Sequence, residues 1–464
     1  MATWDAADRR DQGSAGTPNR LRPVILGGGF AGIAAAISLA DRRERPLLVE
    51  SRPFLGGRTR SFHHEGSGEE IDNGQHLMMG CYTETLALLE KLGTRHLVEV
   101  QSGLSVELRD DSGIRHLRAR SSLPAPLDVL AGMLRLERLT FSERLGLLRA
   151  GVGARTGRPR SLESVEAWLD RHRQSPRLKR LLWHPLVIAT MNTSPEEASA
   201  ELFITLLRLS FLKGGPGSSL ALPLAGLSRL IEPTADYIRE RGGEVLTGTS
   251  VMRTEPVVDG ERGARGVWTI SGRNLDLTTD RLISALPWHR FADLFGEYLP
   301  DALQHTIPAP DHNPILSLYL WYDRPLTQVP RLTALVGTGI EWVFNRRKIV
   351  TEGSPRYPGL LSCVISNVGD TGDEEEFIRR SVAEIAGRIP EIGDARPVDH
   401  LIIREKRATF SATPEIIAKR IRPGKILPGL EVYGDWTATD LPGTIEGAVR
   451  SWSSAPENRI TNNQ

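Results

Sequence analysis

A glycine-rich turn that links an apolar run to an alanine-rich segment constrains the fold of this chain more than any other feature. Pro23–Leu26 is short and apolar, as buried parallel strands are, and leads directly into Gly27-x-Gly29-x-x-Gly32. Phe30–Asp41 then has the pattern of a helix, and Pro46–Glu50 is a second apolar run that ends in an acid. Strand, turn, helix and strand within about thirty residues predict a βαβ unit.

Each glycine of the turn has a physical role in such a unit. Gly27 forms the tight turn, Gly29 lets the backbone approach a pyrophosphate, and Gly32 lets the helix pack closely on the strand. The free amides and dipole of the helix attract phosphates, and Glu50 is placed to accept hydrogen bonds from a ribose. The pattern predicts a dinucleotide site, but by itself it does not separate FAD from NAD.

Composition excludes several other classes of protein. The 464 residues include 58 Lys and Arg against 57 Asp and Glu, and a net charge of +1 argues against a nucleic-acid partner. Cys81 and Cys363 are the only cysteines, so we expect a reducing cytosol, no disulfide and no metal site. Residues 1–20 have the composition of a disordered tail. Residues 23–40 resemble a membrane anchor, but their three successive glycines disfavour a helix and are only weakly apolar, so a membrane-spanning helix is not expected.

The residues after Glu50 separate FAD from NAD. Glu50–Ser61 contains Gly56-Gly57-Arg58 and resembles the extended fingerprint of the FAD-dependent amine oxidase and phytoene desaturase superfamily. Ala225–Val251 resembles the second FAD segment of that superfamily, in which a strand valine packs near the adenine. Tyr433–Trp436 and Pro442–Ala448 resemble its C-terminal signature. No second glycine fingerprint follows a strand, so a separate NAD domain is not expected.

This resemblance implies an α/β fold with a discontinuous, Rossmann-type FAD-binding domain and an inserted α+β substrate domain of antiparallel sheet plus helices. The FAD-binding domain is expected at residues 21–77, 222–291 and 402–464, and the substrate domain at 78–221 and 292–401. The cofactor that the resemblance implies is FAD. Its expected contacts are Gly27, Gly29, Phe30, Ala31, Gly32, Glu50, Ser51, Gly57, Arg58, Asn73, Gly74, Val251, Gly434, Asp435, Gly443, Thr444 and Ile445.

Three segments resemble one branch of the superfamily, the hydroxysqualene dehydroxylases: Ile71–Leu77, Trp183–Leu186 and Leu441–Gly447. Enzymes of this branch remove the hydroxyl of hydroxysqualene to give squalene, in squalene and hopanoid biosynthesis, with reduced FAD as the electron source. The resemblance therefore implies an FAD-dependent oxidoreductase that acts on hydroxysqualene or a similar long isoprenoid. One departure is Ser451-Trp452-Ser453, which replaces a run of small residues, so we expect a short or altered last helix.

The implied reaction needs a proton donor for the leaving oxygen. His76 and Glu446 lie in motifs expected beside the flavin and are the candidates; the alternative is that both only make structural hydrogen bonds. Two other functions remain open. One is a thirty-carbon carotenoid (dehydrosqualene-type) desaturase or oxidase, which would run the flavin in the opposite direction. The other is a non-catalytic, flavin-binding partner of squalene synthesis.

Two further segments suggest how an apolar substrate is handled. Val129–Ala150 interleaves leucines with arginines, which predicts helices that dock on a membrane surface. We therefore expect a cytoplasmic protein, peripheral on the inner face of the cytoplasmic membrane; the alternative is a helix packed on the protein with solvated arginines. Ala198–Leu212 is apolar around most of its circumference and is expected to line a substrate tunnel, with ordinary core as the alternative.

Overall fold

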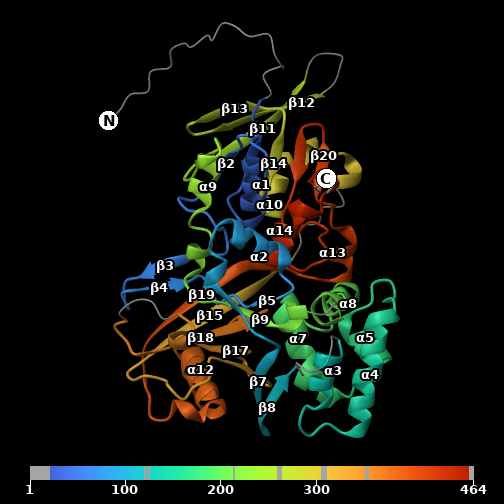
Figure 1. Ribbon diagram of the computed structural model, residues 1–464, viewed down its shortest axis with the longest axis vertical. Helices are drawn as coiled ribbons and strands as arrows, with labels where there is room; N and C mark the ends of the chain where they lie inside the picture. The colour runs from blue at the N-terminus through green and yellow to red at the C-terminus, as the bar shows by residue number, and fades with distance from the viewer. Residues whose placement is uncertain are drawn as a thin grey trace.

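The computed structural model describes residues 21–458 apart from 120–122, 124–125, 213–214, 259–263, 305–310 and 351–354. The expected tail at 1–20 lies outside the described residues. In Figure 1 a mainly parallel sheet occupies the upper half of the molecule and a larger, mainly antiparallel sheet the lower half. The fold is therefore mixed α/β, as the resemblance implies.

The upper sheet has six strands in the order β10-β2-β1-β14-β21-β20. The first five are parallel, and β20 is antiparallel to β21. They come from three distant parts of the chain, as expected for a discontinuous domain. Their bounds are Glu244–Leu246 (β10), Leu47–Val49 (β2), Val24–Leu26 (β1), Leu282–Ser284 (β14), Leu430–Val432 (β21) and Gly424–Leu427 (β20).

Helix α1 (Phe30–Asp41) begins directly after the glycine turn, as predicted, and is buried along almost its whole length. It packs against α9 (Thr234–Glu240) and α14 (Ile445–Ser454). Ser451-Trp452-Ser453, the segment expected to shorten or alter the last helix, lies within α14, which has ten residues, and the ring of Trp452 packs 4.8 Å from that of Tyr433.

The segment that leads into α9 is not one continuous helix. The sequence pattern suggests a continuous helix over 227–241, but the structure has a short 3₁₀ turn at Leu227–Leu230 and starts α9 only at Thr234. Pro233 precedes α9, and a proline is disfavoured inside a helix because its ring blocks a backbone hydrogen bond.

The lower sheet has seven strands in the order β19-β15-β18-β17-β16-β7-β8. All neighbours are antiparallel except β16 and β7. The bounds are Pro397–Phe410 (β19), His312–Tyr322 (β15), Gly359–Ser366 (β18), Trp342–Asn345 (β17), Leu332–Leu335 (β16), Ser105–Asp110 (β7) and Gly113–Arg118 (β8).

Helix α12 (Glu374–Arg388) covers one face of this sheet, with Phe377 and Ile385 in the same apolar cluster as Leu318 and Leu320. The pattern of β15 suggests alternating burial, but the strand is buried almost throughout because its other face is covered as well. That other face forms a wall of the apolar cavity described below.

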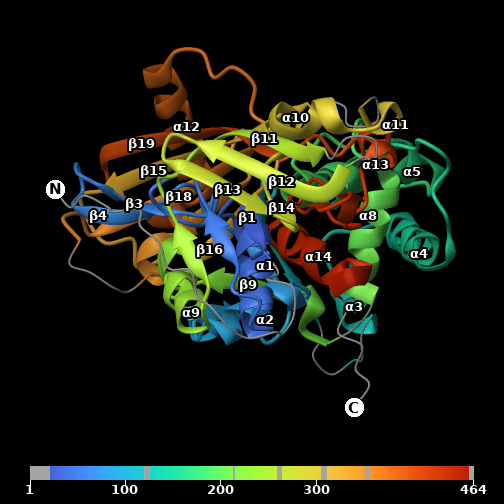
Figure 2. The same cartoon turned by 90° about the horizontal axis from the view of Figure 1, so that it is seen from above.

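A group of helices lies at one side of the lower half, and Figure 2 places α4, α5 and α8 together along that edge. Val129–Ala150 is not one helix: α3 ends at Leu134 and α4 begins at Phe141, where Thr140 and Glu143 form a capping box. The bounds are Leu127–Leu134 (α3), Phe141–Thr156 (α4), Val165–Arg171 (α5), Pro176–Leu178 (α6), His184–Met191 (α7) and Ala200–Leu207 (α8), with π-helical segments at Lys179–Trp183 and Arg208–Leu212.

Small sheets and further helices complete the fold. Two of the expected domain boundaries fall inside strands, since 222 lies in β9 and 402 in β19.

Across the described ranges, no helix is both long enough and apolar enough to cross a bilayer. The remaining elements are β3 (Ser61–His64), β4 (Glu69–Asp72), β5 (Met78–Met79), β6 (Val98–Val100), β9 (Leu220–Pro223), β11 (Val251–Val258), β12 (Ala264–Gly272), β13 (Leu275–Thr279), α2 (Thr83–Lys91), α10 (Trp288–Phe295), α11 (Asp301–Gln304) and α13 (Pro414–Lys419).

Candidate functional site

Two cavities meet between the sheets. The first, of about 650 Å³, begins beyond the carboxyl ends of β1 and β2, where an open parallel sheet binds its ligand. The second, of about 330 Å³, is mainly apolar and reaches down to the lower sheet. Seven residues line both and mark the junction: Arg58, His76, Glu405, Ala408, Gly443, Thr444 and Ile445.

The glycine turn leaves room for a ligand in the first cavity. Gly27 has φ +104°, and a Cβ there would lie 2.8 Å from the carbonyl oxygen of Ala285. A Cβ on Gly32 would lie 1.9 Å from the carbonyl oxygen of Gly27, so this glycine is required for helix packing. A Cβ on Gly29 would meet nothing within 4 Å, which is the open space that a pyrophosphate approaching the backbone needs.

Most of the predicted FAD contacts line this first cavity. Gly32 lines neither cavity, and Asn73 and Gly74 line the apolar one instead. The predicted residues that line the first cavity are Gly27, Gly29, Phe30, Ala31, Glu50, Ser51, Gly57, Arg58, Val251, Gly434, Asp435, Gly443, Thr444 and Ile445.

Glu50 is held rigidly at the wall of the first cavity. One carboxylate oxygen accepts the N–H of Gly28 at 2.6 Å. The other accepts the Ser51 hydroxyl at 3.0 Å and the N–H of Arg52 at 2.8 Å. A buried carboxylate fixed in this way is a preorganised acceptor, which fits the ribose-binding role predicted for it.

Arg58 joins the N-terminal and C-terminal FAD motifs. Its Nη2 lies 2.7 Å from Oδ2 of Asp435, and its Nη1 donates to the carbonyl oxygen of Ala408 at 2.7 Å. The Asp435 carboxylate is the main cause that raises the pKa of Arg58, so the guanidinium remains a fixed positive charge at the junction of the cavities. These residues fit an FAD whose pyrophosphate and flavin need such a charge.

The two proposed proton donors have different surroundings. Both oxygens of Glu446 are occupied, because they accept the N–H groups of Glu84 and Thr85 and the Thr85 hydroxyl at 2.8 to 3.2 Å. This pattern favours the alternative in which Glu446 caps the start of α2. Within the described part of the chain, the ring of His76 makes no hydrogen bond, and burial lowers its pKa. His76 is thus free to contact a ligand, but as a neutral ring it is a weak proton donor.

The apolar cavity is formed by helices on one side and the lower sheet on the other. The segment predicted to line it does so in part, through Leu206, Leu209, Ser210 and Phe211, while Phe203 packs in the core instead. Pro185 and Leu186 of the Trp183–Leu186 motif also line it. Sequence reasoning missed Glu341 and Glu405, because isolated acids in strands and turns form no motif.

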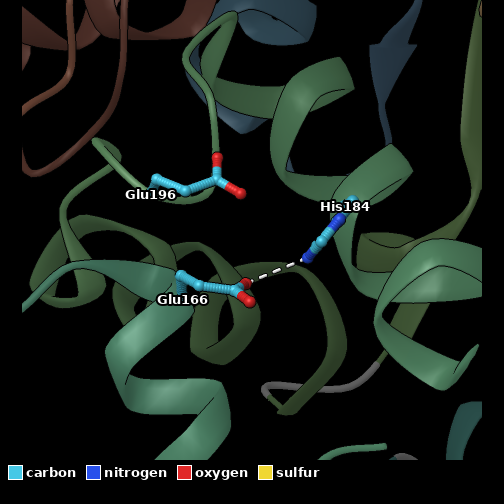
Figure 3. Close-up of side chains that lie close together, drawn as sticks. All are labelled: Glu166, His184 and Glu196. Carbon is cyan, nitrogen blue, oxygen red and sulfur yellow. Dashed lines mark hydrogen bonds and ion pairs between the residues drawn. The ribbon is translucent and has the colours of Figure 1, made fainter. Parts of the chain in front are cut away.

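Glu166, His184 and Glu196 form a cluster of the kind that could hold a metal ion (Figure 3). Nε2 of His184 lies 2.9 Å from Oε2 of Glu166. Glu166 already has a cation, since Nζ of Lys179 lies 2.6 Å from its other oxygen and 2.5 Å from Oδ1 of Asp170. The group lines neither cavity, and we interpret it as an ion-pair network that ties α5 to α7.

Comparison with known proteins identifies the family. The model of the family described as flavin containing amine oxidoreductase matches residues 30–451. The chain belongs to this family. It is an FAD-dependent oxidoreductase, and FAD is its cofactor. The fingerprints at residues 27–58 and 433–448 are therefore confirmed as indicators of the superfamily.

Similar proteins include hydroxysqualene dehydroxylases and phytoene desaturases. The chain is 29% identical to a hydroxysqualene dehydroxylase of Rhodopseudomonas palustris and 25% identical to one of Zymomonas mobilis, each over 93% of this chain and 97% of the relative. It is 26% identical to a 15-cis-phytoene desaturase of Synechococcus elongatus, over 93% of this chain and 94% of the relative. An oxidoreductase from Methanosarcina mazei has the same fold, with a TM-score of 0.71 and 17% identity over 94% of this chain and 100% of that one.

Proposed function

We propose that this protein removes the hydroxyl group of hydroxysqualene, or of a very similar long isoprenoid alcohol, to give squalene. The observation that carries the proposal is the mainly apolar cavity that opens on the FAD cavity at His76 and Thr444. The names and full-length coverage of the dehydroxylase relatives support the same reaction. The product is a precursor of hopanoids, which places the reaction in squalene and hopanoid biosynthesis.

The residues of the chain bind, orient and shield the substrate in this reaction. The hydroxyl leaves as water after taking a proton, and the carbon gains a hydride. Bound, reduced FAD supplies that hydride. The apolar walls, including Leu206 and Phe344, exclude water that would otherwise capture a carbocation. Arg58 is positioned to offset negative charge at the junction of the cavities. His76 lines both cavities, so it is placed to contact the substrate and the cofactor.

A lipid-conversion assay tests the proposed reaction against the desaturase alternative. The similarity to a phytoene desaturase is the reason to include this alternative. FAD-loaded protein is chemically reduced under anaerobic conditions and incubated with hydroxysqualene, and oxidised protein is incubated with dehydrosqualene. We expect squalene from the first reaction and no further desaturation in the second. Desaturated product from the second reaction alone would identify a carotenoid desaturase, and no conversion in either would leave only flavin binding.

The same proposal includes docking on a membrane, where such a substrate is dissolved. Helix α4 supports this, because four of its apolar side chains, Phe141, Leu145, Leu148 and Val152, are exposed along one face. Arg144 and Arg149 lie in the same helix and are also exposed. An exposed apolar ridge flanked by arginines suits the surface of an anionic bilayer. We propose that the protein is peripheral on the inner face of the cytoplasmic membrane.

A further inference from the structure

One acidic side chain lies where the two cavities meet. Among the residues that line both cavities, Arg58 and Glu405 carry the charged side chains, and Glu405 is the acid. It belongs to none of the sequence motifs. Because hydride transfer needs the reacting carbon beside the flavin, a substrate in the apolar cavity must present that carbon where this cavity meets the FAD cavity. Glu405 therefore lines the place where the chemistry has to occur.

An irregularity in β19 brings Glu405 and Ala408 to the same junction. Glu405 pairs with Ile315 of β15, whereas Thr409, four residues further along β19, pairs with Asn313, two residues earlier on β15. The extra residues in β19 form a bulge, and a bulge changes the direction of the side chains beside it. The carbonyl oxygen of Ala408 accepts Nη1 of Arg58 at 2.7 Å. The bulge thus places a carboxylate beside the wall that holds Arg58.

The protein holds the carboxylate of Glu405 only weakly. From the described residues each oxygen accepts one hydrogen bond, Oε2 from Nδ2 of Asn73 and Oε1 from the N–H of Arg407, and both are long at 3.4 Å. The side chain is half-buried. By contrast, Glu446 accepts three hydrogen bonds of 2.8 to 3.2 Å. The charge of Glu405 is therefore available to a ligand at the junction.

The neighbours of Glu405 do not cancel its charge. Nη2 of Arg58 lies 2.7 Å from Oδ2 of Asp435, so these two charges offset each other. Asp435 is the main cause that raises the pKa of Arg58, and the charge of Glu405 adds to this effect across the junction. Burial lowers the pKa of His76, which leaves that ring neutral. Arg407 is exposed, so water and salt screen its charge.

We propose that Glu405 stabilises the positive charge that develops on the substrate carbon as its hydroxyl leaves. The inference rests on the proposed function and deepens it. In that reaction the C–O bond breaks with its electron pair on oxygen, the oxygen takes a proton and leaves as water, and the carbon takes a hydride. Fully reduced FAD holds both the proton and the hydride. Until the hydride arrives the carbon is electron-deficient, and a fixed carboxylate beside an apolar cavity stabilises it more than water would.

Two ligands that differ only in charge test the proposal without turnover. In one, a dimethylammonium nitrogen replaces the carbon that carries the hydroxyl in hydroxysqualene; in the other, a dimethyl-substituted carbon does so. FAD-loaded protein is kept oxidised and titrated with each ligand in identical detergent micelles while the flavin absorbance is followed. The preference for the cation is the ratio of the two dissociation constants. Comparing this ratio between proteins cancels any difference in how the ligands enter the micelles.

We expect the preference for the cation to fall about 10- to 100-fold from wild type to Glu405→Gln, through weaker binding of the cation, because one close charge pair is lost. Glu405→Asp keeps the charge and should keep most of the preference. Asp399→Asn is the matched control: it removes the same charge from the same strand, but Asp399 lines neither cavity, so the ratio should not change.

Glu405→Ala replaces Glu405→Gln in the titration should the latter fail to take up FAD. A wild-type ratio in the variants that lack the carboxylate would overturn the inference, and squalene formation in the conversion assay would then still support the proposed function. Wild-type protein that prefers the cation but converts no hydroxysqualene would contradict the proposed function, and with it the reaction in which this charge acts.

Discussion

At the scale of single residues, the buried Glu446 and the half-buried Glu341 show how neighbours decide the role of a side chain. Glu446 accepts three hydrogen bonds, two of them from backbone N–H groups at the start of α2. Among the other described residues, Glu341 accepts hydrogen bonds from Ser366 alone, whose backbone nitrogen lies 2.7 Å from Oε2, and it lines the mainly apolar cavity. The first arrangement stabilises a helix, whereas the second leaves a carboxyl group available to a ligand.

Replacing Glu446 by alanine should lower the stability of the folded protein and have little effect on turnover. The change leaves the N–H groups of Glu84 and Thr85 without their acceptor, at a cost of about 2 kcal/mol. We expect a lower melting temperature for Glu446→Ala, with Glu90→Ala on the exposed side of α2 as the control. If the melting temperature is unchanged and turnover is lost with FAD fully bound, Glu446 is the proton donor instead.

The raised pKa of Glu341 predicts a pH-dependent stability difference between wild type and Glu341→Gln. The folded protein holds this proton up to about pH 7, whereas the unfolded chain releases it near 4.5. Wild type therefore loses stability relative to the glutamine variant as pH rises through this window, by about 3 kcal/mol in total. Thermal melts should show that the melting temperature of Glu341→Gln rises relative to that of wild type between pH 5 and pH 8. An equal difference at both pH values would contradict the assigned environment.

At the scale of elements, α4 has two faces with different partners. Leu147 and Ala150 pack in the core, while Phe141 is 83% exposed and Val152 62% exposed. The sequence pattern indicated an amphipathic basic segment, but it did not reveal that the segment breaks into two helices. The break follows from the capping box at Thr140, which starts a new helix and turns Phe141 outward.

The exposed face of α4 predicts that two charges there abolish membrane binding. We expect wild type to float with liposomes that contain anionic lipid, and Phe141→Asp plus Val152→Asp to remain in the bottom fraction, because aspartates oppose both insertion and the negative surface. Ser142→Asp plus Thr156→Asp adds the same charge at exposed polar positions of α4 and should reduce flotation less. Equal loss in the two double variants would show that charge alone matters.

At the scale of the whole molecule, the sequence predicted the cofactor domain much better than the substrate domain. The glycine turn, Glu50, Arg58 and Asp435 are predictable because each belongs to a motif with a fixed local geometry, and all of them line the first cavity. The wall of the apolar cavity comes from strands and helices far apart in the chain, and its residues share only apolar character. Glu341, which precedes β17 and belongs to no sequence motif, is found in that wall only from the structure.

The cofactor cavity joins segments from both ends of the chain, so FAD should stabilise the whole fold, and Gly29 allows this to be tested separately from folding. Gly29 has φ −76° and open space where a side chain would lie, so Gly29→Val should fold normally without cofactor but fill the space needed by the pyrophosphate. Added FAD at about a hundred times its dissociation constant contributes roughly 2.7 kcal/mol to wild type.

We expect wild type and Gly29→Val to melt at the same temperature without cofactor, and FAD to raise the melting temperature of wild type alone by several degrees. Gly103→Val is the matched control, because its added side chain also meets open space but lies outside both cavities. It should respond to FAD as wild type does. If Gly29→Val binds FAD, as its yellow colour would show, and its melting temperature rises as much as that of wild type, the pyrophosphate binds elsewhere than at this turn.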